Sequence, residues 1–406
     1  MIHDALVIGG GPSGSAAAIL LAQAGWSVAI VEKRSFPRRK VCGEFISATN
    51  AELLDTLGIG NAFRSSAGPD IRRVGLFVGG TTVVTKMPGK PGGVSCGRAL
   101  DRAVLDTLLL RRAAGAGVFV IQPATAVRLT PCAEGHVCEV GTKAGRKTLR
   151  ARVVVAAYGS WERDFRRPDR SPRHCASDLL AFKAYFLGGR LPTDLMPLLA
   201  FHGGYGGMVH SNEGRVSLSL CIRRDALEDA RRHTRDGPAG DAVIGHIVKS
   251  CRGVREALAG AERHGAWLAA GPIRPGIRKP YADDVFAVGN LAGEAHPIIA
   301  EGIGMAIQSS RLLAAELIAR RSTLTTESGR ARAGRAYSIA WRRCFATRIR
   351  ASAFLARLAM RPGASVLLPL LERFPDILTI GARLSGKMML QPAGRAPGPE
   401  AAAPMS

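Results

Sequence analysis

A chain of 406 residues is long enough for two or three domains, and 47% apolar with 22% charged residues is typical of a globular protein. The net charge of +24 suits anionic partners, but only 5% of residues are aromatic and no nucleic-acid module is recognisable, so we expect no nucleic-acid partner. Eight scattered cysteines lack metal-ligand spacing, which predicts reduced thiols and no metal site. No apolar run reaches the ~20 residues of a membrane span, and the N-terminus leads straight into a strand, so we expect a cytoplasmic protein.

The first elements predict a strand–helix–strand unit. A short apolar run at 5–8 indicates a buried strand, 15–24 a helix and 28–31 a second strand. Between the first strand and the helix, three glycines form the pattern G-x-G-x-x-G: Gly9, Gly11 and Gly14. In such a unit the glycines allow a tight turn, close approach of a diphosphate and close helix–strand packing.

The second strand ends on Glu32, eighteen residues after Gly14. A carboxylate at this place can accept hydrogen bonds from ribose hydroxyls. The free N–H groups at the start of the predicted helix favour phosphate binding. We therefore predict that a dinucleotide binds at this turn.

Further along the chain, the pattern changes twice. Helices and strands alternate up to a buried strand at 152–156, with a hairpin at 73–87. Strand candidates without intervening helices then predict an antiparallel sheet between 161 and 271, with charged helical material from 225 to about 264. Two or three Arg-rich amphipathic helices are expected between 337 and 384.

Three blocks of the sequence carry a resemblance to a known family. They are GGGPSGSAAA…VEK, GRALDRAVLD and VGNLAGEAHPIIAEGIGMAI. Together they resemble the FAD-dependent geranylgeranyl reductase and aromatic hydroxylase superfamily, which has the fold of para-hydroxybenzoate hydroxylase. The loop KVCGEFIS and the stretch HGGYGGMVHSNEGRVSLSL are similar to the geranylgeranyl reductase branch.

The resemblance implies an α/β fold. We expect a Rossmann-like FAD-binding domain with a mainly parallel sheet, an inserted antiparallel β-sheet substrate domain and C-terminal helices. The expected boundaries are 1–70, 96–160 and 280–325 for the FAD-binding domain; 71–95 and 161–279 for the substrate domain; 330–390 for the helical region; and 391–406 for a disordered tail.

The resemblance also implies which residues bind FAD. Arg98 would neutralise the diphosphate or reach the ribityl chain, the backbone around Ala126 would meet the adenine, and the Gly302–Gly304 helix start would face the flavin. The full expected set is Gly9, Gly11, Pro12, Ser13, Gly14, Glu32, Lys33, Cys42, Arg98, Ala126, Gly289, Asn290, Gly302, Ile303 and Gly304.

Two departures from the family pattern concern the cofactor. The family usually has Gly-Asp where this chain has Gly289-Asn290; an asparagine amide can still bond a ribityl hydroxyl. It also usually has Gly-Ala-Asp-Gly where this chain has the sequence AAYG at 156–159, which includes Tyr158. This second change argues against conventional NADPH docking. NAD(P)H is then expected as a transient electron donor, or another protein delivers the electrons.

Three side chains are candidates for catalysis. His296 lies in the loop expected beside the flavin and is a candidate acid–base group or donor to an oxygen intermediate. Cys42 is expected to face the flavin, and Glu44 follows it in the same turn. Each also has a purely structural reading: a histidine satisfied by backbone, a small buried thiol and a loop acid.

The leading hypothesis is an FAD-dependent monooxygenase of secondary metabolism that hydroxylates a hydrophobic aromatic or polyketide-like substrate. The alternative is a geranylgeranyl-reductase-like flavoenzyme that saturates isolated C=C bonds of a prenyl chain, which KVCGEFIS favours. A second alternative is a flavin electron-relay protein at the inner membrane face, since the segment AWRRCFATRIRASAFLARLAMRP separates arginines from apolar residues. Halogenation is disfavoured because Trp161 and Trp267 stand alone, outside any W-x-W-x-I-P stretch.

Overall fold

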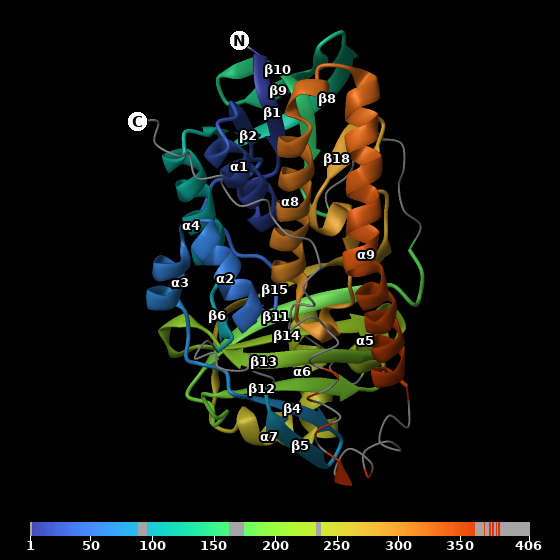
Figure 1. Ribbon diagram of the computed structural model, residues 1–406. Helices are drawn as coiled ribbons and strands as arrows, with labels where there is room; N and C mark the ends of the chain where they lie inside the picture. The colour runs from blue at the N-terminus through green and yellow to red at the C-terminus, as the bar shows by residue number, and fades with distance from the viewer. Residues whose placement is uncertain are drawn as a thin grey trace.

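The computed structural model describes residues 2–87, 96–161, 174–232 and 237–361, together with 369, 373, 374, 376, 379 and 381. The predicted tail at 391–406 therefore lies outside the described residues, as do most of 362–390, 88–95 and 162–173. Two large sheets form the body of the protein (Figure 1). The first lies in the upper half of the figure and the second in the lower half.

The upper sheet is mainly parallel. Its central strands pair in the order β18-β10-β1-β2-β7, all in parallel. Their bounds are β1 Ile2–Ile8, β2 Val28–Val31, β7 Phe119–Ile121, β10 Gly145–Ala156 and β18 Val285–Ala287. A short strand, β17 (Tyr281–Ala282), adds to one edge in antiparallel orientation. The predicted Rossmann-like, mainly parallel sheet is confirmed.

This sheet is the middle of three layers. Because successive side chains of a strand point to opposite faces, Ala5 and Val7 pack into a core with helices, whereas Leu6 and Ile8 pack against two further strands. The helices are α1 Pro12–Gln23, α4 Arg102–Gly115, α8 Gly302–Ala319 and α9 Glu327–Ala359; the strands are β8 Ala124–Cys132 and β9 Gly135–Thr142. The β8–β9 hairpin continues antiparallel into β10.

The lower sheet has seven strands in the order β15-β11-β14-β13-β12-β4-β5. Their bounds are β4 Arg73–Val78, β5 Thr81–Lys86, β11 Leu179–Leu187, β12 Leu195–Phe201, β13 Gly204–His210, β14 Val216–Arg223 and β15 Glu262–Ile273. The predicted antiparallel sheet is confirmed, with one difference: β12 pairs with β4 in parallel. This pairing joins the early hairpin to strands that come more than a hundred residues later.

Three helices cover one face of the lower sheet. They are α5 Arg224–Arg232, α6 Ala239–Ser250 and α7 Arg252–Ala257. Phe182, Ala184 and Phe186 of β11 pack against them. The expectation of helical material as far as 264 is wrong at its end, since β15 begins at Glu262 and pairs with β11 along its length.

Several short elements connect the two halves. They are β3 Phe45–Ile46, α2 Ala48–Thr56, α3 Gly60–Ser66, β6 Arg98–Ala99, β16 Gly276–Ile277, β19 Gly293–Glu294, and the 3₁₀ turns η1 Asn212–Gly214, η2 Gly289–Leu291, η3 Pro297–Ile299 and η4 Arg321–Thr323. β3 pairs with β6, and β16 pairs with β19. These pairings hold the loop after β2 and the loop before α8 between the two sheets.

The C-terminal part differs from expectation. The helical region begins earlier than 337: a helix of 33 residues, α9, begins at Glu327 and runs beside both sheets (Figure 1), whereas most of 362–384 lies outside the described residues. Thr326 caps its start by accepting a hydrogen bond from the Gly329 N–H at 3.1 Å. No glycine or proline interrupts the chain from 335 to 361, so nothing breaks the helix. Within the described ranges, no helix has the length and apolar character to cross a membrane.

Candidate cofactor and substrate cavity

One cavity of about 690 Å³ lies between the two sheets, and both of them contribute to its wall. At one end it is lined by the glycine turn after β1 and by the end of β2. At the other end it is lined by the inner strands of the lower sheet. Residues from β1 at the start of the chain to Phe345 of α9 therefore face one continuous space.

The glycine turn has the geometry of a phosphate cradle. Gly9 has φ +108°, and a Cβ there would lie 2.6 Å from the Ala157 carbonyl oxygen. A Cβ on Gly14 would lie 1.8 Å from the Gly9 carbonyl oxygen, so only glycine lets α1 start here. At Gly11, by contrast, the nearest atom is an Arg38 nitrogen at 4.0 Å. The N-terminus of α1 is thus open to an anion in the cavity.

Glu32 lies where the sequence predicts it, in the cavity wall after β2. Its carboxylate accepts hydrogen bonds from the N–H groups of Gly10 (2.7 Å) and Arg34 (2.9 Å) and is 4% exposed. These bonds hold the side chain beside the glycine turn. The neighbouring Lys33 and, on β8, Ala126 also line the cavity.

The late loop meets the glycine turn from the other side. Gly289 has φ +61°, and a Cβ there would lie 2.7 Å from the Ser13 Oγ. Ser310 of α8 donates a hydrogen bond to the Ser13 carbonyl at 2.7 Å. Pro12, Ser13, Gly289, Asn290, Gly302 and Ile303 all line the cavity. The glycine cradle, the carboxylate for a ribose and this second loop together fit a dinucleotide such as FAD.

Two of the expected cofactor glycines lie in close contact with neighbouring elements. Gly14 and Gly304 do not line the cavity. A Cβ on Gly304 would lie 2.1 Å from the Asn50 amide nitrogen, so this glycine allows α8 to approach α2.

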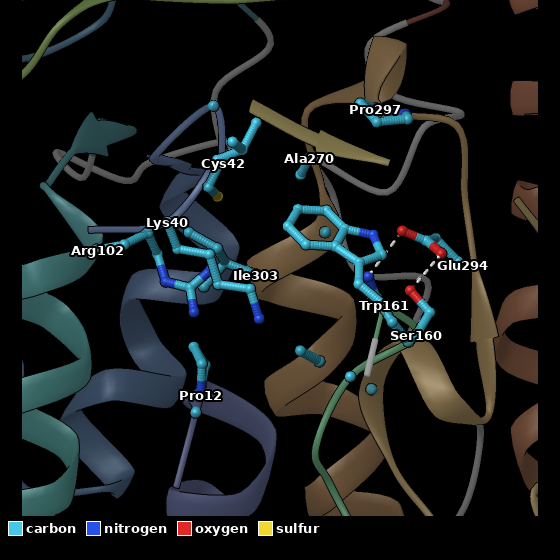
Figure 2. A pocket seen from close by; sticks show the side chains of 18 of the residues that line it. Pro12, Lys40, Cys42, Arg102, Ser160, Trp161, Ala270, Glu294, Pro297 and Ile303 are labelled. Carbon is cyan, nitrogen blue, oxygen red and sulfur yellow. Dashed lines mark hydrogen bonds between the residues drawn. The ribbon is translucent and has the colours of Figure 1, made fainter. Parts of the chain in front are cut away.

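Asn290, which stands where an aspartate was expected, is hydrogen-bonded to Glu294. Its amide donates to the Glu294 carboxylate at 2.9 Å. Glu294 also accepts a hydrogen bond from Ser160 at 2.8 Å (Figure 2). A carboxylate oxygen of Glu294 lies 3.4 Å from an Arg278 nitrogen. Burial raises the pKa of Glu294, partly offset by the Ser160 hydrogen bond and by Arg278. Sequence reasoning missed this carboxylate, although Glu294 stands only four residues after Asn290.

Arg98 does not reach the cavity. It lies in β6 and pairs with Asp70 at 2.7 Å and with the Arg64 carbonyl at 3.0 Å. Arg102, one helical turn later, lines the cavity instead and is buried against Asp106 by two hydrogen bonds of 2.7 and 2.8 Å. The physical reason is that α4 begins only after Asp101, which caps it.

Lys40 lies beside Arg102, and both side chains extend into the same region near Cys42 (Figure 2). Burial, together with the positive charges of Arg102 and Arg38, lowers the pKa of Lys40 to about 8. Its Nζ also lies 5.3 Å from the centre of the Trp161 ring. The middle of the cavity therefore carries a cluster of positive charge that suits a diphosphate or an anionic reduced flavin.

The three catalytic candidates all line the cavity. The Cys42 carbonyl accepts a hydrogen bond from Ser219 at 2.8 Å, and the Cys42 Sγ lies 3.5 Å from the Glu44 nitrogen. His296 Nδ1 lies 3.0 Å from the Tyr205 hydroxyl. Burial, with a smaller contribution from Arg357, lowers the pKa of His296 to about 4, so this imidazole is neutral at pH 7.

Glu44 adopts a left-handed backbone conformation with φ +65° and is buried. Its Oε1 accepts hydrogen bonds from Lys183 and Tyr185, both on β11. Sequence reasoning did not single out these partners or Tyr205. A lysine in a strand usually marks a solvent-facing position, and a tyrosine in a strand gives no sign of its partner.

The lower sheet gives the cavity an apolar wall. Its lining residues are Ala181, Met196, Leu198, Tyr205, Gly206, Gly207, Met208, Val209, Ser219, Leu220, Cys221, Leu268, Ala269, Ala270 and Ile273. Two of these have hydroxyl groups, and both hydroxyls are engaged: Tyr205 with His296 and Ser219 with Cys42. The wall therefore suits a substrate that is apolar along its length.

Comparisons with known proteins agree with this geometry. The FAD binding domain model matches residues 3–164. Digeranylgeranylglycerophospholipid reductase 2 of Methanopyrus kandleri is 29% identical over 331 residues, which cover 78% of each chain. The menaquinone reductase of Mycolicibacterium smegmatis is 28% identical over 78% of this chain and 76% of its own length.

Another relative, conditioned medium factor receptor 1 of Dictyostelium discoideum, is 24% identical over 78% of this chain, and the match spans 63% of its length. Among solved structures, the myxobacterial chondrochloren halogenase CndH superposes with a TM-score of 0.74 at 21% identity, covering 95% of this chain and 91% of its own. At that identity the likeness establishes the fold.

Proposed function

Since the chain contains an FAD binding domain and its relatives include geranylgeranyl-lipid and menaquinone reductases, we propose that it reduces C=C bonds in the prenyl chain of a lipid or quinone. The observation that carries the proposal is the wall of the lower sheet, where both hydroxyl groups already bond to neighbouring protein groups. A prenyl chain needs no hydrogen-bond partner along its length, whereas a phenol or a carboxylate does. The two reductases named above act on prenylated molecules, which supports the same choice.

Bound FAD would supply the two electrons as a hydride. The protein's own residues would position it: the N-terminus of α1 and Arg102 would bind the diphosphate, and Glu32 would accept hydrogen bonds from the ribose hydroxyls. Glu294 holds the Asn290 amide in the loop that would contact the ribityl chain. The apolar strands hold the alkene and exclude water.

The test is a single anaerobic turnover. The protein is loaded with FAD, reduced with dithionite under argon and mixed with a geranylgeranyl-bearing phospholipid. We expect reoxidation of the flavin with the gain of two hydrogens per reduced bond by mass spectrometry. An unchanged lipid, with flavin that stays reduced until air is admitted, contradicts the proposal.

Hydroxylation is the second candidate, and the Tyr205–His296 pair favours it. A neutral imidazole that shares a hydrogen bond with a phenol at the cavity wall can donate to an oxygen intermediate. The same protein under air distinguishes the two reactions. An oxygenated product with aromatic substrates supports hydroxylation, whereas hydrogen peroxide without product argues against it. Titration of the oxidised protein with NADPH and NADH under argon tests the proposal that a nicotinamide acts as transient donor.

We also propose peripheral contact with an anionic membrane, from which a lipid substrate would enter. On α9, Phe354 is 67% exposed and lies between Arg350 and Arg357 on one helix face. Such a face combines apolar insertion with attraction to anionic lipid. Flotation with anionic vesicles in low salt tests it: co-flotation that Phe354→Ser weakens is expected, and absence of the wild-type protein from the vesicle fraction contradicts it.

A further inference from the structure

A buried ionic network lies where the loop after β2 meets the lower sheet. Ala181 of β11 lines the cavity. Since alternate residues of a strand share a face, Lys183 and Tyr185 point to the same side as Ala181. Both donate hydrogen bonds to one oxygen, Oε1, of Glu44. The network therefore joins the lower sheet to a residue of the cavity wall.

The other oxygen of Glu44 has no such partner. Oε2 is buried, and no hydrogen bond to it is found among the described residues. Glu44 and Lys183 are each only 1% exposed, so solvent does not satisfy them. A buried carboxylate oxygen without a partner costs free energy. Because Glu44 lines the cavity, a molecule bound in the cavity is the available partner.

The rest of the network holds the donors in place. The Arg215 guanidinium lies 4.6 Å from the centre of the Tyr185 ring, and its nitrogen lies 3.5 Å from an Asp101 oxygen. Burial and the neighbouring Glu44 carboxylate raise the pKa of Tyr185 far above its ordinary value. Tyr185 therefore stays protonated and remains a donor at any physiological pH.

We propose that Glu44 is the proton donor of the cavity, that Lys183 supplies its proton and that Tyr185 positions its carboxyl group. The identity of the acceptor, a prenyl alkene, rests on the function proposed above. Reducing a C=C bond requires a hydride on one carbon and a proton on the other, and no solvent-exposed acid is needed if a wall residue carries that proton.

The first step moves a proton from Lys183 to Glu44. An N–H bond of the Lys183 ammonium breaks and an O–H bond forms on Glu44, which leaves a neutral amine and a neutral acid. Burial penalises both charged forms, which brings this neutral pair closer in energy to the ion pair. Rotation of the carboxyl group presents the proton to the cavity.

The O–H bond then breaks as a C–H bond forms on one alkene carbon. The other carbon would gain a hydride, which bound reduced FAD would supply, as the π bond breaks. Glu44 is again a carboxylate, and the Lys183 amine regains a proton from water after the product leaves.

Infrared difference spectroscopy tests this without any substrate. Photoreducing the bound flavin adds negative charge to the cavity, which favours the neutral acid at Glu44. We expect a protonated-carboxyl C=O band to appear on photoreduction of the wild-type protein, to be absent in Glu44→Gln and to persist in Glu294→Gln. In Lys183→Met the proposed source of the proton is absent, so no band appears on reduction.

A second variant keeps the test decisive should Glu44→Gln not fold. Tyr185→Phe preserves the ion pair and removes one hydrogen bond to Oε1, so the band should shift in frequency. A wild-type protein without the band, a band that survives in Glu44→Gln or an unshifted band in Tyr185→Phe overturns the proposal.

The anaerobic turnover separates this proposal from the proposed function. In Glu44→Gln we expect alkene reduction to slow by about 100-fold, with FAD affinity and photoreduction unchanged. Glu228→Gln, an exposed site on α5, is the matched control and should equal the wild type. If the wild type reduces no alkene yet shows the Glu44 band, the proposed alkene substrate is wrong, but the proposal that Glu44 is a proton donor is retained. If Glu44→Gln reduces the alkene at the wild-type rate, the proposal that Glu44 is the proton donor is overturned.

Discussion

The two ends of the cavity differ in how they bind. At the glycine turn, backbone N–H groups, Glu32 and Arg102 offer many polar contacts that fit a single kind of ligand. At the lower sheet, the wall is apolar, and its few ionic groups are paired with one another, as Glu44 is with Lys183. The first end therefore selects a ligand by its charges and hydroxyl groups, and the second selects by shape and apolarity.

The largest effect is expected at the glycine turn. In Gly11→Asp, a carboxylate would lie at the N-terminus of α1, where the cavity is open and the backbone φ of −70° accepts any side chain. Like charges in contact cost several kcal/mol, so we expect FAD affinity to fall by at least about 100-fold. Fluorescence titration with FAD measures it.

Gly11→Ala is the matched control, because it adds a Cβ without a charge. The thermal unfolding midpoint of both cofactor-free variants should stay near the wild-type value. Equal FAD affinities for Gly11→Asp and Gly11→Ala would show that no phosphate approaches this turn.

The next largest effect is expected at Arg102, and Arg98, four residues earlier, is its control. Replacing Arg102 together with its buried partner, as Arg102→Met with Asp106→Leu, avoids leaving a buried charge unpaired. Loss of a charge-assisted hydrogen bond of about 1.5–3 kcal/mol should weaken FAD binding by roughly 10- to 100-fold. Arg98→Met should leave FAD affinity unchanged, since Arg98 lies outside the cavity. If FAD binding weakened in Arg98→Met but not in the Arg102 variant, Arg98 and not Arg102 would be the residue that contacts the diphosphate.

At the apolar end, Leu198→Asn places an amide in the wall beside the substrate. Loss of apolar contact of about 1.4 kcal/mol should raise the Kd for the prenyl lipid by about 10-fold, with FAD affinity unchanged. Equilibrium binding to the oxidised holoprotein measures both quantities. A change in FAD affinity without a change for the lipid would mean that this wall does not contact the substrate.

The smallest effect concerns the Asn290–Glu294 contact. In Asn290→Asp, two carboxyl groups would face each other across 2.9 Å and raise the pKa of one of them further. A carboxyl whose pKa is raised on folding adds stability below its unfolded pKa and loses it as pH rises. We therefore expect Asn290→Asp to be less stable than the wild type at pH 8 and close to it at pH 4, measured by urea unfolding at each pH. An equal loss of stability at pH 4 and at pH 8 would contradict this expectation.

The nucleotide end was largely predictable from the sequence, because its signals are local. The glycines, the helix and Glu32 lie within the first 32 residues, and strand periodicity places them in order. Arg98 was harder to place: whether 98 or 102 faces the cavity depends on where α4 begins, and Asp101 decides that as the helix cap.

The apolar end was less predictable, because its contacts join distant segments. Glu44 meets Lys183 across 139 positions, and Tyr205 meets His296 across 91. Alternation within β11 indicates a strand but not that its lysine is buried. That burial depends on the fold of the loop after β2, which no local pattern specifies.

The central claim is that one cavity holds FAD at the glycine turn and an apolar chain against the lower sheet. The most direct measurement is the visible spectrum of the FAD-reconstituted protein as a prenyl lipid is added under argon. We expect one flavin per chain and a saturable shift of its absorption bands as the lipid binds. A protein that retains no flavin, or a flavin spectrum that stays unchanged while the lipid is bound, would contradict the account.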